Sequence, residues 1–261
     1  MPTKTIKFLL ITFALTWACW LPGLLFSIYS FNILKSIYIP FIIVGTFVPS
    51  TVGIIFLKKS KQNIKKRLNF KIGKWWIPII LIFPIGGLLA QLAHTIINGS
   101  DFTSPSNIIL LPIQFLMILV LMGPLGEEFG WRGYLLPQIQ KKYNAFISSI
   151  IVGLIWVFWH IPLFFIEGAP QSKLPFIQFS ITLIISSILI TWIQNNTKQN
   201  LWPALIIHTM INFTNEIFQL IDITNNNYIP WIYANIILCV FTFIIILRNK
   251  TEILTKKEIY S

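Results

Sequence analysis

Eight long apolar stretches divide this 261-residue chain, and they constrain its fold more than any other feature. A helix needs about 20 apolar residues to cross the hydrocarbon core of a bilayer. The stretches run over 8–30, 36–57, 75–97, 108–136, 146–166, 175–193, 201–221 and 229–247. Only 11% of the residues are charged, whereas a soluble domain has roughly 25%. We therefore predict an all-α polytopic membrane protein with about eight transmembrane helices, organised as a single integral membrane domain over residues 1–261.

The basic residues predict how this protein is oriented. Of the 20 Lys and Arg residues, 17 fall in segments that alternate onto one side of the spans, eight of them in the loop 58–74. Only Lys35 and Lys173 fall on the other side. Because Lys- and Arg-rich loops remain in the cytoplasm, both termini are expected there, in a multi-pass protein of the plasma (cell) membrane. The net charge of +12 then reflects orientation beside membrane lipids, and no nucleic-acid partner is expected.

Rare polar side chains inside the spans mark a candidate site, because ionisable groups are costly in a membrane. They are Glu127, Glu128 and Arg132 in the fourth stretch, His160 in the fifth, and His208 and Asn212 in the seventh. At a rise of about 1.5 Å per residue, all three spans bring them to similar depth in the inner half of the membrane. The spacing of Glu128 and Arg132 predicts an intrahelical ion pair, and Glu127 points about 100° away. His94 and Glu216 lie further outward and are interpreted as structural.

These residue types suit the hydrolysis of an amide bond within the membrane. Glu127 with His160 could hold and deprotonate a water molecule, while His208 and Asn212 could donate hydrogen bonds to the oxyanion of an attacked carbonyl. The chain has no G-x-S-x-G nucleophile motif and no H-E-x-x-H zinc motif. A zinc site made by Glu127, His160 and His208 is the open alternative, although the interpretation without a metal or other cofactor is favoured. Trp131, Trp156 and Trp159 are assigned to packing.

The same residues form three motifs, Glu127-Glu128-x-x-x-Arg132, His160 four residues after an aromatic residue, and His208-x-x-x-Asn212. They resemble the signature motifs of the CAAX protease and bacteriocin-processing (CPBP, or Abi) family, the intramembrane glutamic endopeptidases that include type II CAAX prenyl proteases. The resemblance implies a catalytic region over about 108–221 and a membrane-anchored peptide or protein substrate. It also implies that Glu127 and His160 activate water, that His208 and Asn212 form the oxyanion site, and that Glu128 and Arg132 support them. The family pattern has Phe where this chain has Trp156, which predicts a bulkier wall near the substrate.

Two functions other than a peptidase are consistent with the sequence. A proton-coupled transporter would use Glu127, Arg132 and the histidines as a relay, but transporters often contain internal repeats, and none is visible. A catalytically silent immunity or binding protein on the same scaffold would be favoured by loss of a motif residue, and all six are present. The sequence does not distinguish prenyl-protein processing from bacteriocin maturation or immunity.

Overall fold

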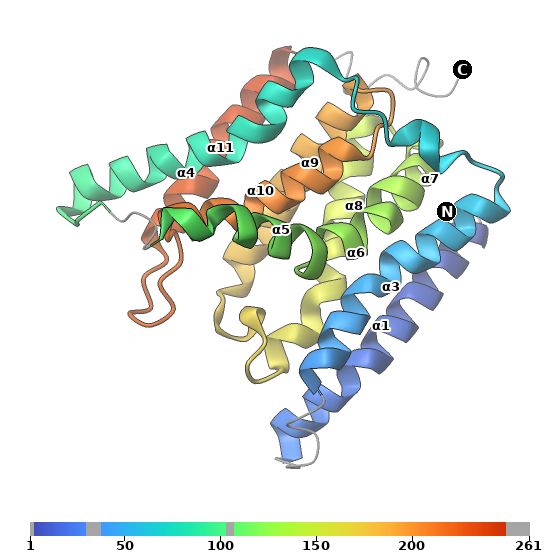
Figure 1. Ribbon diagram of the computed structural model, residues 1–261, viewed down its shortest axis with the longest axis horizontal. Helices are drawn as coiled ribbons and strands as arrows, with labels where there is room; N and C mark the ends of the chain where they lie inside the picture. The colour runs from blue at the N-terminus through green and yellow to red at the C-terminus, as the bar shows by residue number, and fades with distance from the viewer. Residues whose placement is uncertain (1–2, 30–37, 103–106, 249–261) are drawn as a thin grey trace.

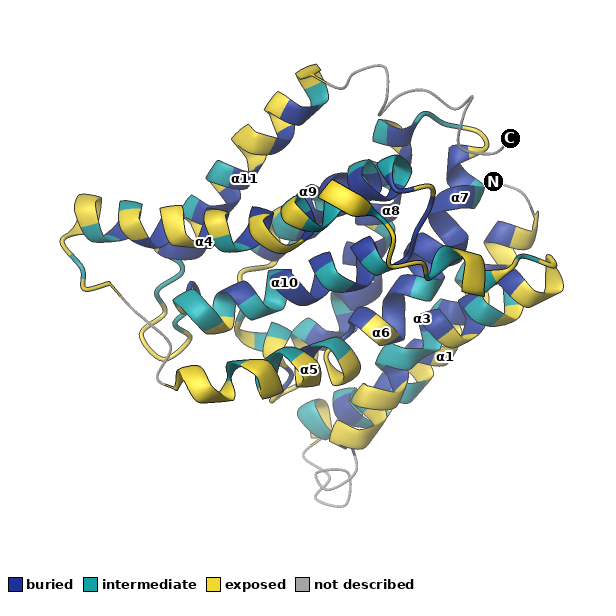
Figure 2. Cartoon of the chain, turned by 45° about the horizontal axis from the view of Figure 1, so that its top comes forward, coloured by how far each residue is buried: buried dark blue, intermediate teal, exposed yellow. Residues whose placement is uncertain are grey.

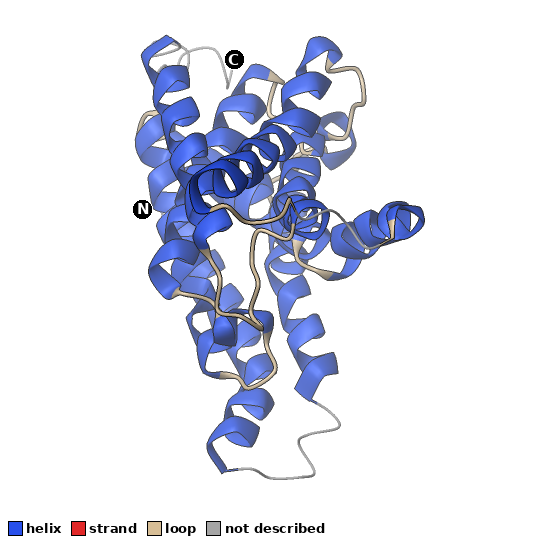
Figure 3. Cartoon of the chain, turned by 90° about the vertical axis from the view of Figure 1, so that its left-hand side faces the viewer, coloured by secondary structure: helices blue, strands red, loops and turns tan. Residues whose placement is uncertain are grey.

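Helices form the regular structure of this protein. The computed structural model describes residues 3–29, 38–102 and 107–248, and within these ranges it contains no β-strand, only an isolated bridge between Asp222 and Asn227. Figure 3 shows helices joined by loops throughout. The long helices are α1 (Thr3–Tyr29), α3 (Tyr38–Lys59), α4 (Trp76–Asn98), α5 (Leu111–Leu121), α8 (Ala145–His160), α9 (Phe176–Asn196), α10 (Trp202–Phe218) and α11 (Ile229–Arg248). Short 3-10 turns are η1 (Ile64–Arg67), η2 (Gly73–Trp75), η3 (Ile108–Leu110), η5 (Ile161–Phe165) and η6 (Pro170–Lys173). The all-α prediction is confirmed.

Seven helical segments of the described residues are long and apolar enough to cross a membrane, so the chain is a multi-pass membrane protein. They correspond to seven of the eight predicted stretches. The remaining stretch, 201–221, folds as α10, which has 17 residues and is shorter than these seven. It ends at Phe218 because Gln219 adopts a left-handed conformation with φ of 47°. Large apolar side chains such as those of Leu10, Ile96 and Ile109 point outward, as lipid-facing positions require.

The helices pack so that the most deeply buried ones lie at the centre. α1 packs along α3, α8 packs against α9, and α4 contacts both α10 and α11 (Figure 1). Figure 2 shows α8 and α10 largely buried, whereas α5 and the outer sides of α1 and α3 are exposed. His160 of α8 and His208 of α10 are therefore buried within the bundle, whereas Asn212 of α10 is only partly buried.

The loops predicted to be cytoplasmic meet at one end of the bundle. Nε of Arg67 donates to the carbonyl of Gln199 at 2.9 Å, and the side chain of Gln140 donates to the side chain of Asn195 at 3.2 Å. These contacts join the 58–74, 137–145 and 194–200 loops, in keeping with the predicted alternation. Lys35 and the basic tail 249–261, which also support the predicted orientation, lie outside the described residues.

The fourth predicted span is not one continuous helix, so the prediction for 108–136 was wrong in this respect. α5 ends at Leu121, and after Gly123, whose φ is 110°, the chain resumes as α6 (Pro124–Glu128). A π-helical segment, η4 (Phe129–Leu135), and α7 (Leu136–Gln140) follow. The break has a local cause: glycine tolerates positive φ, and the proline that follows has no N–H for a helical hydrogen bond.

The π-helical segment lies unusually close to α3. The hydroxyl of Ser50 accepts a hydrogen bond from the backbone N–H of Phe129 at 3.2 Å. A methyl group on Gly53 would lie only 2.7 Å from the Cα atom of Gly130. Small residues permit such close approach of membrane helices. Since π-turns occur frequently at functional sites, it is notable that η4 contains Arg132.

The orientation of the two ends can be tested by cysteine labelling. Single cysteines at Lys61 and at Asn225, in a background with Cys19 and Cys239 replaced by Ser, would report opposite ends of the bundle. We expect a membrane-impermeant maleimide to label Asn225→Cys in intact cells and Lys61→Cys only after permeabilisation, because the Lys- and Arg-rich loop remains in the cytoplasm. The reverse pattern would contradict the prediction.

Candidate active site

The carboxylate of Glu128 lies at the centre of the motif residues. Its Oε1 atom accepts hydrogen bonds from Nη1 of Arg132 at 2.9 Å and from Nδ1 of His208 at 2.8 Å. Glu128 and Arg132 are completely buried. The predicted ion pair between Glu128 and Arg132 is therefore present, and the structure adds His208, which comes from a helix 80 residues further along the chain.

The hydrogen bond to Glu128 fixes the chemistry available to His208. Because Nδ1 donates to the carboxylate, Nε2 is a donor only when the imidazole carries a second proton. A protonated His208 and Arg132 would together balance the negative charges of Glu127 and Glu128. Charge balance of this kind is important where a low dielectric makes any unpaired charge expensive.

Glu127 points to the other side of the cluster, as its position one residue before Glu128 predicts. Its Oε2 atom accepts hydrogen bonds from the indole N–H of Trp156 at 2.5 Å and from that of Trp131 at 3.2 Å. A Cβ atom on Gly123 would lie 2.6 Å from Oε1 of Glu127 and 3.3 Å from Nε2 of His208. Both groups therefore face the break between α5 and α6.

Trp131 and Trp156 were assigned to packing from the sequence, and that assignment missed their hydrogen bonds to Glu127. The spacing of Glu127 and Trp131, four residues apart, was a signal for the first bond. The bond from Trp156, 29 residues away on α8, had no local signal. The ring of Trp156 also stacks on the guanidinium of Arg132, whose Cζ atom lies 4.3 Å from the ring centroid.

His160 and Asn212 each donate a hydrogen bond to a backbone carbonyl near the cluster. Nδ1 of His160 donates to the carbonyl of Trp156 at 2.8 Å, which leaves Nε2 of the neutral ring as an acceptor. Nδ2 of Asn212 donates to the carbonyl of Met122 at 3.3 Å, at the break after α5. Because an amide nitrogen carries two N–H bonds, Asn212 keeps a second donor for another acceptor.

The residues proposed as zinc ligands do not form a ready metal site. Within residues 3–29, 38–102 and 107–248, no group of three or more His, Cys, Asp or Glu side chains is arranged to hold a metal ion. The set Glu127, His160 and His208 is therefore not preassembled for zinc.

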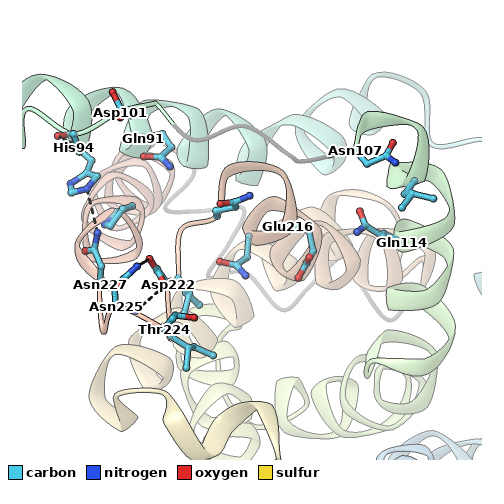
Figure 4. Close-up of a pocket in the computed structure, with 17 residues that line it drawn as sticks. Gln91, His94, Asp101, Asn107, Gln114, Glu216, Asp222, Thr224, Asn225 and Asn227 are labelled. Atoms are coloured by element: carbon cyan, nitrogen blue, oxygen red, sulfur yellow. Dashed lines mark hydrogen bonds between the residues drawn. The ribbon is translucent and has the colours of Figure 1, made fainter.

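His94 and Glu216 lie in a different part of the molecule, as expected from their outward positions. They line a polar cavity of about 1010 Å³, together with Asp101, Gln114 and Asp222 (Figure 4). Nδ1 of His94 lies 3.1 Å from the side-chain oxygen of Asn98. None of the six motif residues lines this cavity among the residues described.

The ion pair at the centre of the cluster predicts a measurable effect on stability. Glu128→Gln is expected to lower the free energy of unfolding by about 3–5 kcal/mol, because it leaves the Arg132 guanidinium buried without a counter-charge. The double variant Glu128→Gln/Arg132→Met should recover part of this loss. Unfolding of the purified protein by SDS in mixed micelles measures both values, with Glu216→Gln as a control on an exposed carboxylate. Equal losses in the single and double variants would contradict the argument.

Comparison with known proteins finds relatives that match the segment containing the motif residues. Residues 109–214, which include all six motif residues, match the family model described as Type II CAAX prenyl endopeptidase Rce1-like. A CAAX prenyl protease 2 from Methanococcus maripaludis is 27% identical over 239 residues, covering 82% of this chain and 84% of the relative. A lysostaphin resistance protein A from Staphylococcus haemolyticus is 31% identical over 86 residues, 33% of this chain and 22% of that relative. Over the segment that contains its motifs the chain is therefore similar to type II CAAX prenyl endopeptidases, and these similarities indicate a peptidase embedded in the membrane.

Proposed function

We propose that this protein is an intramembrane endopeptidase that uses Glu127 as its general base on a membrane-associated or lipidated peptide. One observation carries the proposal: Oε1 of the buried Glu127 and Nε2 of His208 face the same point beside Gly123. A carboxylate and a potential cation on either side of one point suit a reaction that begins with deprotonation of water and ends with an oxyanion.

The reaction follows from the hydrogen-bonding capacity of each group. Glu127, assisted by Nε2 of His160, takes a proton from a water molecule, and the resulting hydroxide attacks the carbonyl carbon of the scissile peptide bond. The second N–H of Asn212 and Nε2–H of protonated His208 donate to the oxyanion. When the tetrahedral intermediate collapses, the proton held by Glu127 passes to the departing amine. Glu128 and Arg132 orient and balance the charge of His208.

The substrate class is supported by the surroundings of the site. α5 leads directly to the break beside Glu127, and its side chains Ile113, Leu116 and Val120 are exposed and apolar. A peptide held in the membrane by an acyl or prenyl chain would have such a surface beside it. The relative from Methanococcus maripaludis is named for the processing of CAAX prenyl proteins, which favours a lipid near the C-terminus of the substrate.

Replacement of Glu127 tests the general base. Glu127→Ala and Glu127→Gln are expected to lower kcat by about 10²–10⁴-fold, because general base catalysis contributes that much. Cleavage of farnesylated C-terminal peptides by the full-length protein in liposomes, followed by mass spectrometry, measures the effect. Glu216→Gln and His94→Ala serve as matched controls, since both residues lie in the separate polar cavity.

Three outcomes of this experiment would contradict the proposal. Cleavage that survives Glu127→Gln would eliminate Glu127 as the base. Cleavage that a chelator abolishes and zinc restores would favour a metal-dependent mechanism. Uptake of intact peptide into the liposomes without cleavage would indicate a transporter.

A further inference from the structure

We propose that Trp156, together with Trp131, positions the Glu127 carboxylate so that Oε1 is the oxygen that receives the proton of the attacking water. The inference rests on the proposed function of Glu127 as general base. Trp156 is a positioning residue in this proposal, since it acts through Glu127 and does not touch the reacting atoms.

The geometry separates the two oxygen atoms of Glu127. Oε2 accepts both indole N–H bonds, from Trp156 at 2.5 Å and from Trp131 at 3.2 Å. Trp131 lies one turn after Glu127 on the same chain segment, whereas Trp156 approaches from α8. All three side chains are at least 98% buried. Oε2 is therefore held from two directions, while Oε1 faces the point beside Gly123 that Nε2 of His208 also faces.

The two indole donors also determine which oxygen atom of Glu127 can accept a proton. An indole N–H only donates, so both bonds require an unprotonated oxygen atom. When a water molecule loses a proton to Glu127, its O–H bond breaks, the proton binds to Oε1, and the electron pair remains on the hydroxide that attacks the carbonyl carbon. Protonation at Oε2 would take one of the two lone pairs that accept these bonds, and would therefore break at least one hydrogen bond in a buried site, at substantial energetic cost.

Trp156 itself contacts three of the charged or titratable groups around Glu127. Its ring stacks on the guanidinium of Arg132 at 4.3 Å and packs edge-on against His208, with 4.9 Å between ring centroids. Its carbonyl accepts the hydrogen bond from Nδ1 of His160 at 2.8 Å. Arg132 and His208 both donate to Glu128, the remaining charged group beside Glu127. A phenyl ring at position 156 would keep an aromatic face on Arg132 but would lack the donor to Oε2.

A neighbouring tryptophan provides a matched control. Trp159 lies on the same helix, is completely buried and packs on Trp131 and His160. Its indole N–H has no hydrogen-bond partner among the described residues. Trp156→Phe and Trp159→Phe therefore remove the same atoms from one helix, but only the first removes a hydrogen bond to Glu127.

The decisive experiment compares these two variants in the full-length protein in liposomes. Trp156→Phe is expected to lower kcat about 10–100-fold with little change in KM, the effect of losing one hydrogen bond to a charged group. The acid limb of its pH profile should move to higher pH, because the lost donor stabilises the ionised carboxylate. Trp159→Phe should retain both kcat and the profile. Equal losses in the two variants, or an unmoved acid limb in Trp156→Phe, would overturn the proposal.

A second measurement needs no substrate. It also tests the contact between Trp156 and Glu127 if the Trp156→Phe variant folds poorly. Replacing Trp156 by 3-benzothienylalanine keeps the shape of the ring and substitutes sulfur for the N–H group. Infrared titration of the Glu127 carboxyl band, assigned with Glu127→Gln, should show ionisation at higher pH in this variant than in the unmodified protein. Identical titrations would overturn the contact between Trp156 and Glu127. Cleavage that survives Glu127→Gln would instead overturn the proposed function, so the two failures are distinguishable.

Discussion

A single oxygen atom, Oε1 of Glu128, joins the parts of the chain that make the site. It binds Arg132 from the π-helical segment and His208 from α10, while Arg132 in turn stacks on Trp156 of α8. In the membrane interior an ionised group without a partner costs several kcal/mol, and the Glu128–Arg132 pair gives each of these buried charges a partner within one segment. His208 of α10 and Trp156 of α8 add contacts to this pair from two further helices.

Backbone N–H and carbonyl groups also need hydrogen-bond partners wherever a helix is interrupted. The break after α5 frees the carbonyl of Met122, which Asn212 satisfies, and the N–H of Phe129 finds Ser50 on α3. The carbonyl of Arg132 accepts from both Arg67 and Gln194. Irregular backbone is tolerated at membrane depth only where protein groups complete its hydrogen bonds. The interruption that turns Glu127 toward the site is thus stabilised by side chains from four other segments.

The sequence was sufficient for the parts of this structure that depend on local spacing. Apolar length predicted the spans, and the interval between Glu128 and Arg132 predicted their ion pair. The break at Gly123-Pro124 was missed because the apolar stretch 108–136 was interpreted as one continuous helix. Two other hydrogen bonds depend on how α8 and α10 are rotated against α6, and no local pattern encodes that rotation. They join His208 to Glu128 and Trp156 to Glu127. The catalytic roles of all six motif residues remain predictions.

Arg67 connects the basic loop to the far end of the motif segment. Its guanidinium donates to the carbonyls of Arg132, Gly133 and Gln199. Gln199 follows α9, so the hydrogen bond from Arg67 to Gln199 can form only after most of the chain has been synthesised. His208 and Asn212 arrive later still, on α10. During membrane insertion the carboxylates of Glu127 and Glu128 therefore enter before the groups that complete the site. The cluster of motif residues is therefore incomplete in a nascent chain until α10 is in place.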